Sequence, residues 1–344
     1  MAFDISQSIT SSELLNFSQN FSVARPTVLD TLFPAIKTEY FEAEYYRLMD
    51  GQILPTTAYV HALDTEAVIG QRPGFEKVLQ EKLFIKEKIN QSERIKMLIN
   101  KGVPDNDGLI KWVFDDMARL AESVVIRTLV AKGQLLSTGK IKIKENNVDM
   151  EIDYGLPSEN KITFGDWSDP EYDAFGDIEK AVKVLTDKGY IPNRLLTSST
   201  QISYLRKNKA MQTAVLGATN ARLLTKTELM ALIFEEFGLE VQLCDEMYSY
   251  IKADGTKGFK KYLGEDKVCI YTAGANGSIG TGLWGPTPEE QEYRQFIQKS
   301  NSSFVTLTMW ATPDPVATWT KASGMYIPVL PMPYSLVIGT VQEG

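Results

Sequence analysis

The stretch "AKGQLLSTGKIKIKENNVDMEIDYG", from Ala131 to Gly155, joins a helical pattern to a β pattern. Before it, apolar residues recur at three- and four-residue steps, which predicts one long helix over residues 105–135. After it, "KIKIK" and "VDMEIDY" alternate between polar and apolar side chains on either side of Glu-Asn-Asn. Because asparagine tolerates a positive φ, this pattern predicts a β-hairpin directly after the helix.

The segment from Gly133 to Lys140 also has the outline of a phosphate-binding loop, but its spacing does not fit one. Five residues separate the glycines where a Walker loop has four, and Ile141 follows Lys140 in place of Ser or Thr. A phosphate loop also leads from a strand into a helix N-terminus, whereas here a helix leads into a strand. We therefore expect Gly133 and Gly139 to end the helix and Lys140 to begin the hairpin.

The net charge and the residue composition of the chain exclude several classes of protein. Its 344 residues carry a net charge of −8, which argues against coating a polyanion through overall charge. One histidine, His61, and two cysteines are too few for a Cys/His zinc site or a disulfide framework, and they favour a reducing compartment. The N-terminus lacks a secretory signal pattern, and no apolar run is long enough to span a membrane. We expect no metal, no cofactor and no membrane.

Upstream of the long helix, the chain predicts extended structure. Residues 1–58 indicate an arm with short helical pieces. In residues 59–92, "AYVHALDTEAVIG" and "EKVLQEKLFIKEKI" flank the turn-forming "GQRPGF", which predicts a long two-stranded ribbon with its lysines in solvent. Such a ribbon is marginally stable alone, so we expect it to rest on another surface.

Downstream of the hairpin, residues 164–301 predict an α/β unit and residues 302–344 return to β structure. Asp177 is expected to cap a helix that stops at Gly189, and a capping box at Thr225 to Glu228 opens another that closes on Gly238. "LEVQLCDEMYSYI" and "DKVCIYT" predict strands. The fold class is therefore α+β.

Catalytic and ligand-binding motifs find little support. The glycines of "AGANGSIGTGLWGPTPEEQ" are followed by prolines instead of a helix, so they do not form a dinucleotide fingerprint, and we expect a surface loop. The acidic "DWSDPEYDAFGD" lacks the EF-hand order, which favours a solvated loop with a helix cap. No GxSxG, HExxH or kinase motif occurs.

The order of parts, arm, ribbon, long helix, hairpin, α/β insertion and β return, resembles the major capsid proteins of tailed bacteriophages with the Hong Kong 97-like fold. More narrowly, it resembles the lambda-type major capsid protein E family. The stretches that carry the resemblance, in order, are "AYVHALDTEAVIGQRPGFEKVLQEKLFIKEKI", "DDMARLAESVVIRTLVAKGQLLSTGKIKI", "VDMEIDYGLPSENKITFGDWSDPEYDAFGDIE", "KKYLGEDKVCIYTAGANGSIGTGLWGP" and "MWATPDPVATWTKASGMYIPVLPMPYSLVIGTVQ". The arm matches least, and the glycine loop departs from the family.

The resemblance implies a division of the chain into capsid domains. It implies an N-terminal arm at 1–58, an E-loop at 59–92 and an axial A-domain at 171–301. The peripheral P-domain would comprise 93–170 and 302–344, with the spine helix at 105–135.

The resemblance also implies a function without catalysis or cofactor. Copies would form pentamers and hexamers and close into an icosahedral head shell around packaged double-stranded DNA, held by weak non-specific contact. Implied partners are a separate scaffolding protein, a portal protein and, as an option left open, a decoration protein. The implied location is the virion, after assembly in the host cytoplasm.

Three groups of residues follow from this assignment. The E-loop would contact a neighbouring subunit through Arg72, Phe75, Lys82, Phe84, Lys86 and Lys88. A loop at the capsomer centre would comprise Asn276, Gly277, Ser278, Gly280 and Trp284. The joint between spine helix and hairpin would comprise Gly133, Gly139 and Lys140. The alternatives are an encapsulin-like compartment shell and a small-ligand-binding or enzymatic α/β protein that uses residues 171–301.

Overall fold

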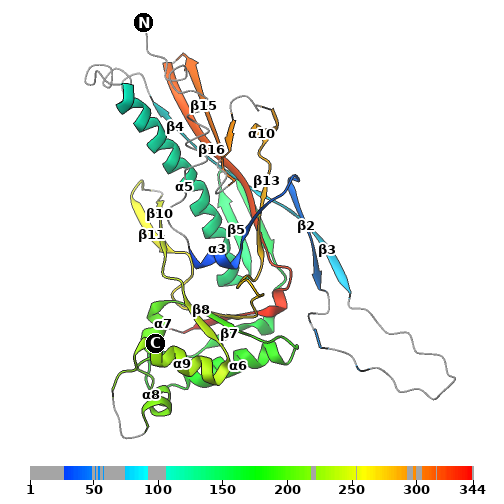
Figure 1. Ribbon diagram of the computed structural model, residues 1–344, viewed down its shortest axis with the longest axis vertical. Coiled ribbons are helices and arrows are strands. Elements are labelled where there is room, and N and C mark those ends of the chain that lie inside the picture. Colours follow the sequence, from blue (N-terminus) through cyan, green and yellow to red (C-terminus); the bar gives the residue numbers. More distant parts are fainter. Residues whose placement is uncertain are drawn as a thin grey trace, which may run out of the picture.

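The chain forms two lobes, one elongated and one compact, in the computed structural model (Figure 1). The structure describes residues 27–342 except 49–50, 52, 55–56, 58–73, 92–105, 218–221, 253, 293–296, 300–303 and 315. The elongated lobe contains one long helix beside long strands. The compact lobe holds a second sheet with several helices and contains the last strand of the chain.

The elongated lobe is built on helix α5 (Asn106–Thr138), which confirms the predicted long helix. At 1.5 Å per residue its 33 residues span about 50 Å. It lies against a sheet whose strand order is β1 (Ala35–Lys37), β13 (Thr281–Gly285), β16 (Val316–Val329), β15 (Thr306–Pro313) and β14 (Ile297–Lys299), with β4 (Leu83–Gln91) also paired to β16. Met117, Leu120 and Val124 of the helix pack on this sheet in a buried cluster with Leu307, Ala322, Tyr326 and Trp284.

The predicted pair of strands, β5 (Lys140–Glu145) and β6 (Val148–Asp153), follows α5 directly. Gly139 adopts a left-handed φ of 73°, and its amide donates to Leu135 O at 2.7 Å, which closes the helix. Strands β5 and β6 then pair around Asn146 and Asn147, whose φ values are 50° and 63°. The predicted role of Gly133 is wrong, because this residue lies inside the helix, five positions before its end.

The compact lobe contains a five-stranded sheet in the order β7 (Lys161–Phe164), β17 (Leu336–Val341), β12 (Lys267–Tyr271), β8 (Arg194–Thr197) and β9 (Glu240–Leu243). Its helices are α6 (Ala174–Thr186), α7 (Ser199–Leu205), α8 (Lys209–Leu216) and α9 (Lys226–Phe237). The capping box at Thr225 and the left-handed Gly238 are confirmed. The cap of α6 is Asp173, however, and the predicted Asp177 is buried, where it accepts hydrogen bonds from Gly165 N and Trp167 Nε1.

The lobes do not follow the predicted sequence boundaries, because strands distant in sequence pair across them. Strand β13 falls in the predicted 171–301 unit yet pairs with β16 in the elongated lobe. Strands β7 and β17, predicted to belong with the long helix, pair with each other in the compact lobe. The remaining short elements are α3 (Val28–Leu32), η1 (Ser158–Asn160), α10 (Pro288–Glu292) and η2 (Pro333–Ser335).

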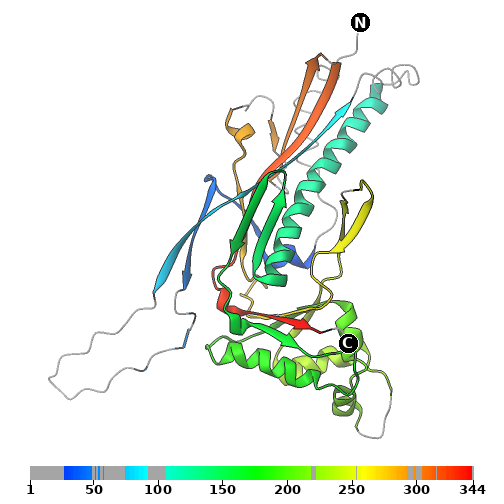
Figure 2. The same cartoon turned by 180° about the vertical axis from the view of Figure 1, so that it is seen from behind.

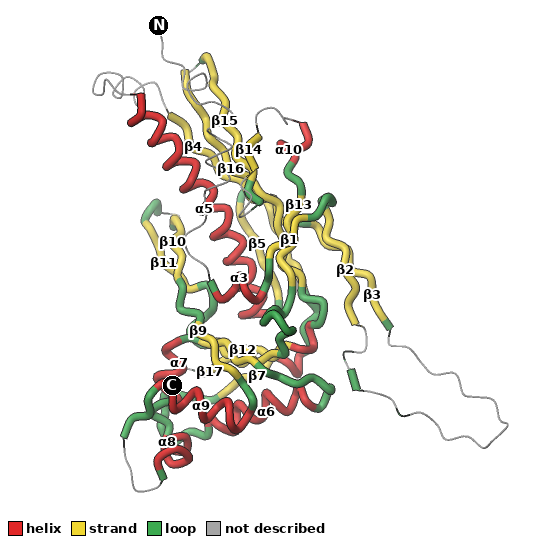
Figure 3. Tube along the Cα trace, in the orientation of Figure 1, coloured by secondary structure: helices red, strands yellow, loops and turns green. Residues whose placement is uncertain are grey.

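Two antiparallel pairs project from this body on opposite flanks, which Figures 1 and 2 show from both sides. The first, here called the ribbon, pairs β2 (Glu42–Leu48) with β3 (Phe75–Glu81). Residues 42–48 were predicted as part of an arm, and the predicted partner at 59–71 lies outside the described residues. The second, here called the hairpin, pairs β10 (Met247–Ile251) with β11 (Lys257–Lys261) beside α5 (Figure 3).

Candidate assembly surfaces

The ribbon leaves the body at Lys82. Strand β3 ends at Glu81 and β4 begins at Leu83, so the chain changes its pairing partner from β2 to β16 at this residue. The Lys82 side chain is 2% exposed. Its ammonium donates to Thr38 Oγ1 at 2.7 Å, to Tyr40 O and to Glu42 O at 3.2 Å. Lys82 therefore ties both strands of the ribbon together at their base.

The surroundings of Lys82 connect this base to the sheet. Thr38 donates through its backbone amide and its hydroxyl to Trp284 O of β13, at 2.7 Å and 3.1 Å. A Cβ at Gly285 would lie 3.0 Å from Lys82 Cδ and 3.1 Å from Tyr40 O, so the glycine leaves the space that the lysine fills. Burial lowers the pKa of Lys82 to about 8. The prediction of a solvated lysine here is wrong, because the side chain is enclosed where the ribbon meets the sheet.

The two faces of the ribbon differ. The inner face lies against the chain itself, with Ala43 buried, Tyr45 packed on the core and Arg47 Nη1 donating to Tyr154 O at 3.1 Å. The outer face exposes three large side chains, Tyr46, Phe75 and Leu79, each more than half accessible. Large apolar groups gathered on one strand pair in this way are typical of an interaction surface.

The hairpin has a similar pattern on the opposite flank. Its inner face carries Tyr248, whose ring stacks on Tyr262 at 5.2 Å between centroids. The alternating register places Met247, Ile251 and Phe259 together on the other face. All three are more than half exposed. This surface was missed from the sequence, where "LEVQLCDEMYSYI" was assigned to one strand; the Asp-Glu that interrupts it was the available signal.

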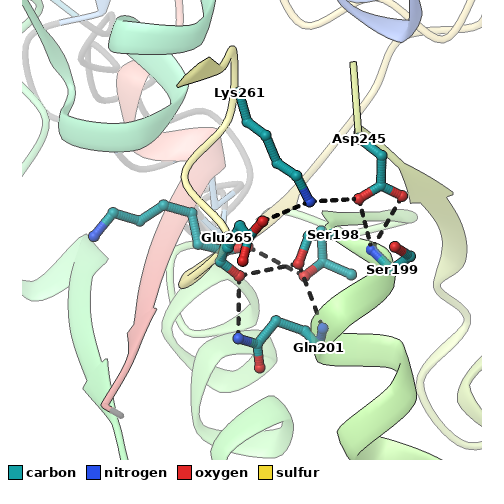
Figure 4. A network of polar contacts seen from close by, with 8 residues as sticks. Ser198, Ser199, Gln201, Asp245, Lys261 and Glu265 are labelled. Carbon is teal, nitrogen blue, oxygen red and sulfur yellow. Dashed lines mark hydrogen bonds and ion pairs between the residues drawn. The ribbon is translucent and has the colours of Figure 1, made fainter. Parts of the chain in front are cut away.

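A polar network fixes the hairpin to the compact lobe (Figure 4). Lys261 Nζ contacts Asp245 Oδ1 at 3.1 Å and Glu265 Oε1 at 2.8 Å. Asp245 in turn accepts from Ser199 N at the start of α7, at 3.1 Å. Burial opposes the charge of Asp245, but the Ser199 amide and Lys261 outweigh it, so its pKa is lowered. The charge of Lys261 is thus used within the molecule.

The same network continues on the helix side. Ser198 Oγ accepts from Gln201 N at 3.4 Å and donates to Glu265 O at 3.0 Å. Gln201 Nε2 donates to the same carbonyl at 3.0 Å. Hydrogen bonds therefore hold the base of the hairpin to the start of α7, and the ion pairs of Lys261 join the residues on either side of its strands.

The remaining predicted E-loop residues lie partly on the ribbon and partly on β4. Phe75 is on the outer face of the ribbon, and Arg72 lies outside the described residues. Phe84, Lys86 and Lys88 are exposed but belong to β4, which pairs with β16 of the main sheet. Lys88 Nζ lies 4.4 Å above the Trp319 ring and Lys86 Nζ 5.1 Å from the Phe84 ring. Their contact with a neighbouring subunit stays a prediction.

The glycine loop lies at the surface, as predicted, only over its first part, where Gly274 and Asn276 are exposed. Asn276, Gly277 and Ser278 form a turn in which Gly274 N donates to Ser278 O at 2.9 Å. Next to this turn, Ile279 and Gly280 donate from their amides to Leu32 O at the end of α3. Trp284 is 3% exposed in strand β13. The assignment of Trp284 to this loop is therefore wrong, because the residue is buried in β13, while Gly280 lies just before that strand. The position of the loop at a capsomer centre stays a prediction.

At the joint, Lys140 begins β5 as predicted. Its ammonium lies 2.8 Å from both Glu151 Oε1 and Asp153 Oδ2, and these cross-strand carboxylates, Asp153 foremost, raise its pKa. Gly133 has a different use from the predicted one. A Cβ there would lie 2.1 Å from Tyr262 O, so the glycine lets Tyr262, the residue after β11, approach the backbone of α5 closely.

Two grooves run along α5. One lies between the helix and the hairpin, with Val125, Ile126, Tyr248 and Tyr250 in its walls. The other lies between the helix, β4 and the β5–β6 pair.

No group of three or more His, Cys, Asp or Glu residues in the described ranges is arranged to hold a metal ion. Of the helices that the structure describes, none has the length and apolarity needed to cross a membrane.

Comparison with known protein structures identifies the fold. The chain is similar to the putative capsid protein of a prophage of E. coli CFT073, with a TM-score of 0.58 and 17% identity over 99% of this chain and 100% of that one. It is also similar to a phage-related protein from Bordetella bronchiseptica RB50, with a TM-score of 0.54 and 13% identity over 96% of each chain. These similarities show the fold, which is Hong Kong 97-like.

The sequence itself gives the family. No curated protein sequence matches this chain. Residues 10–341, nearly its whole length, match the family described as phage major capsid protein E. The members of this family build the capsid shell of the virion. The chain therefore belongs to the phage major capsid protein E family.

Proposed function

We propose that copies of this chain form pentamers and hexamers that close into the icosahedral head shell around packaged double-stranded DNA. The observation that carries the proposal is the ribbon, which projects from one flank and exposes Tyr46, Phe75 and Leu79 on its outer face. A two-stranded ribbon gains little stability alone, and a neighbouring subunit supplies the missing burial. Contacts between two different surfaces of like subunits generate rings and closed shells.

The two lobes support an assignment of capsid domains. The ribbon, with the residues between its strands, serves as the E-loop that lies over the adjacent subunit. The lobe built on α5 serves as the peripheral P-domain, because its long helix and strands give it the length to reach neighbouring capsomers. The compact α/β lobe serves as the axial A-domain at the capsomer centre.

The shell requires further partners, which the proposal names by role. A separate scaffolding protein directs curvature, a portal protein occupies one vertex, and the outer surface is open to a decoration protein. The net charge of −8 suits weak, non-specific contact with DNA, since strong neutralisation of phosphates would hold the genome in place. Assembly takes place in the host cytoplasm, and no step of it asks for catalysis by this chain.

The test is assembly of the full chain, alone and with the scaffolding protein of the same phage. Sedimentation velocity and negative-stain microscopy should show closed shells of uniform size in the mixture. A chain that stays monomeric or dimeric with its scaffold, while remaining folded, would overturn the proposal.

A further inference from the structure

We infer that the hairpin β10–β11 of one subunit is the surface that receives the ribbon β2–β3 of the next subunit. The inference rests on the proposed function, since it requires copies of the chain to lie side by side. It names the partner of each surface as a second copy of this chain.

The first argument is the match of apolar faces. The ribbon presents Tyr46, Phe75 and Leu79, while the hairpin presents Met247, Ile251 and Phe259. Each set lies on the open side of a two-stranded antiparallel pair whose other side faces its own subunit. Two such faces cover each other as sheets do when they stack about 10 Å apart.

The second argument is charge. The ribbon strands carry four glutamates against one lysine and one arginine, and both cations are already paired: Lys77 with Glu44 at 2.8 Å and Arg47 with Glu76 at 2.6 Å. Glu42 and Glu81 lie directly opposite each other and have no ion-pair partner within the described parts of the chain. The outer face of the ribbon is therefore acidic at its base.

The hairpin has the opposite charge. Residues 247–261 carry four lysines and one aspartate. Lys261 is engaged by Asp245 and Glu265. Lys257 lies on the same face as Met247, Ile251 and Phe259, whereas Lys260 lies on the face of Tyr248. Lys252, Lys257 and Lys260 are exposed and form no ion pair among the residues that the structure describes. Opposite charges on the two surfaces guide their encounter and fix which surfaces meet.

The third argument is position. The ribbon and the hairpin project from opposite flanks of the subunit in both Figure 1 and Figure 2. Each has a fixed base, the ribbon through Lys82 and the hairpin through the Asp245–Lys261–Glu265 network. A surface on one flank that fits a different surface on the other flank produces a head-to-tail contact, which is the kind that closes a ring.

The decisive experiment is disulfide trapping in assembled particles. Leu79→Cys is combined in one chain with Met247→Cys, Ile251→Cys or Phe259→Cys, and particles are oxidised and run on denaturing gels without reductant. At least one pairing should yield a ladder of covalent oligomers up to the pentamer and hexamer. Each variant with only one introduced cysteine is the matched control and should give no ladder, since the native Cys244 and Cys269 are buried. Absence of a ladder from all three pairings, in particles that have formed, would overturn the inference.

A charge experiment tests the second argument separately. Lys257→Glu, on the face of Met247, Ile251 and Phe259, should lower the assembled fraction at least tenfold, while Lys226→Glu, the same change on an exposed lysine of the compact lobe, should not. Circular dichroism confirms that both variants fold. Normal assembly of the hairpin variant contradicts the inference and leaves the proposed function intact; failure of the unmodified chain to assemble with its scaffold contradicts the proposed function itself.

Discussion

Lys82 shows how one residue can set the direction of a whole element. It is buried at the point where β3 gives way to β4, and its ammonium meets oxygens of residues 38–42 instead of a carboxylate. Burial of a charge is costly unless hydrogen bonds compensate. Because these acceptors lie on the segment that enters β2, the compensation exists only when the ribbon leaves the body in its observed direction.

Replacing Lys82 by methionine should therefore weaken the base of the ribbon. The substitution keeps the apolar stem but leaves Thr38 Oγ1, Tyr40 O and Glu42 O without their donor, and we expect a loss of about 1–3 kcal/mol in the free energy of unfolding. Lys77→Met, which removes a solvent-exposed ion pair with Glu44, should have a much smaller effect. Urea unfolding measures both, and a Lys82→Met subunit as stable as the parent would contradict the predicted role of the ammonium.

The pKa of Lys82 gives a second prediction. Burial lowers it from an ordinary value of 10.5 to about 8. Between these values the unfolded chain holds a proton that the folded chain has released, so this group makes the folded state more stable as the pH rises from about 8 to about 10.5. Below pH 8 both states are protonated and its contribution is constant. The stability of the parent relative to Lys82→Met should thus increase across that window, and a flat difference in urea unfolding would refute it.

At the scale of elements, Gly133 is the point where the long helix α5 contacts the end of the β10–β11 hairpin. Glycine inside a helix normally costs about 1 kcal/mol relative to alanine, so Gly133→Ala would be stabilising in an isolated helix. Here the added Cβ would lie 2.1 Å from Tyr262 O and 2.8 Å from Tyr262 C, which are backbone atoms. We expect a net loss of about 1–3 kcal/mol in thermal or urea unfolding. Ser137→Ala, later in the same helix, should stay within about 0.5 kcal/mol, and a stabilised Gly133→Ala would show that the contact yields easily.

The elements that local sequence could predict are those that local forces fix. The long helix follows from its apolar period, the β5–β6 turn from two asparagines that accept positive φ, and α9 from the capping box at Thr225. Residues 42–48 were not predicted as a strand of the ribbon, because their partners lie 27 to 39 residues further along the chain. Sequence patterns record which face of a strand is apolar but not which distant strand it meets.

The residues of the candidate surfaces also divide into those that local sequence could predict and those that depend on distant segments. Phe75 was predicted as a contact residue and lies on an exposed face, because an aromatic side chain on a ribbon can be recognised locally. Lys82 and Trp284 were assigned to solvent or to a loop, yet both are buried where segments distant in sequence converge. The hairpin was missed because "LEVQLCDEMYSYI" was taken as one strand, whereas its two halves form β9 and β10 on either side of Asp245-Glu246.

At the scale of the whole molecule, the chain crosses between its lobes several times. After β12 in the compact lobe, the chain enters the elongated lobe as β13. After β16 it returns to the compact lobe as β17. Neither lobe is therefore a continuous segment, and the two share the helix α5, the Tyr262 contact and the α3 junction. A subunit built in this way presents its ribbon and its hairpin in a fixed relation, which a shell of repeated copies requires.

The outer face of the ribbon should consequently matter for assembly and little for the subunit itself. Changing Tyr46, Phe75 and Leu79 together to serine alters side chains that are 60%, 61% and 57% exposed, so the free energy of unfolding should change by less than about 1 kcal/mol. Each apolar side chain buried at a contact contributes roughly 1.5–3 kcal/mol, and every copy in a ring repeats the contact. We therefore expect a folded subunit that forms no shells with its scaffold by sedimentation and microscopy. The conservative triple Tyr46→Phe, Phe75→Leu and Leu79→Met keeps the face apolar and should assemble. Shells formed equally well by the serine variant would mean that this face is not a subunit contact.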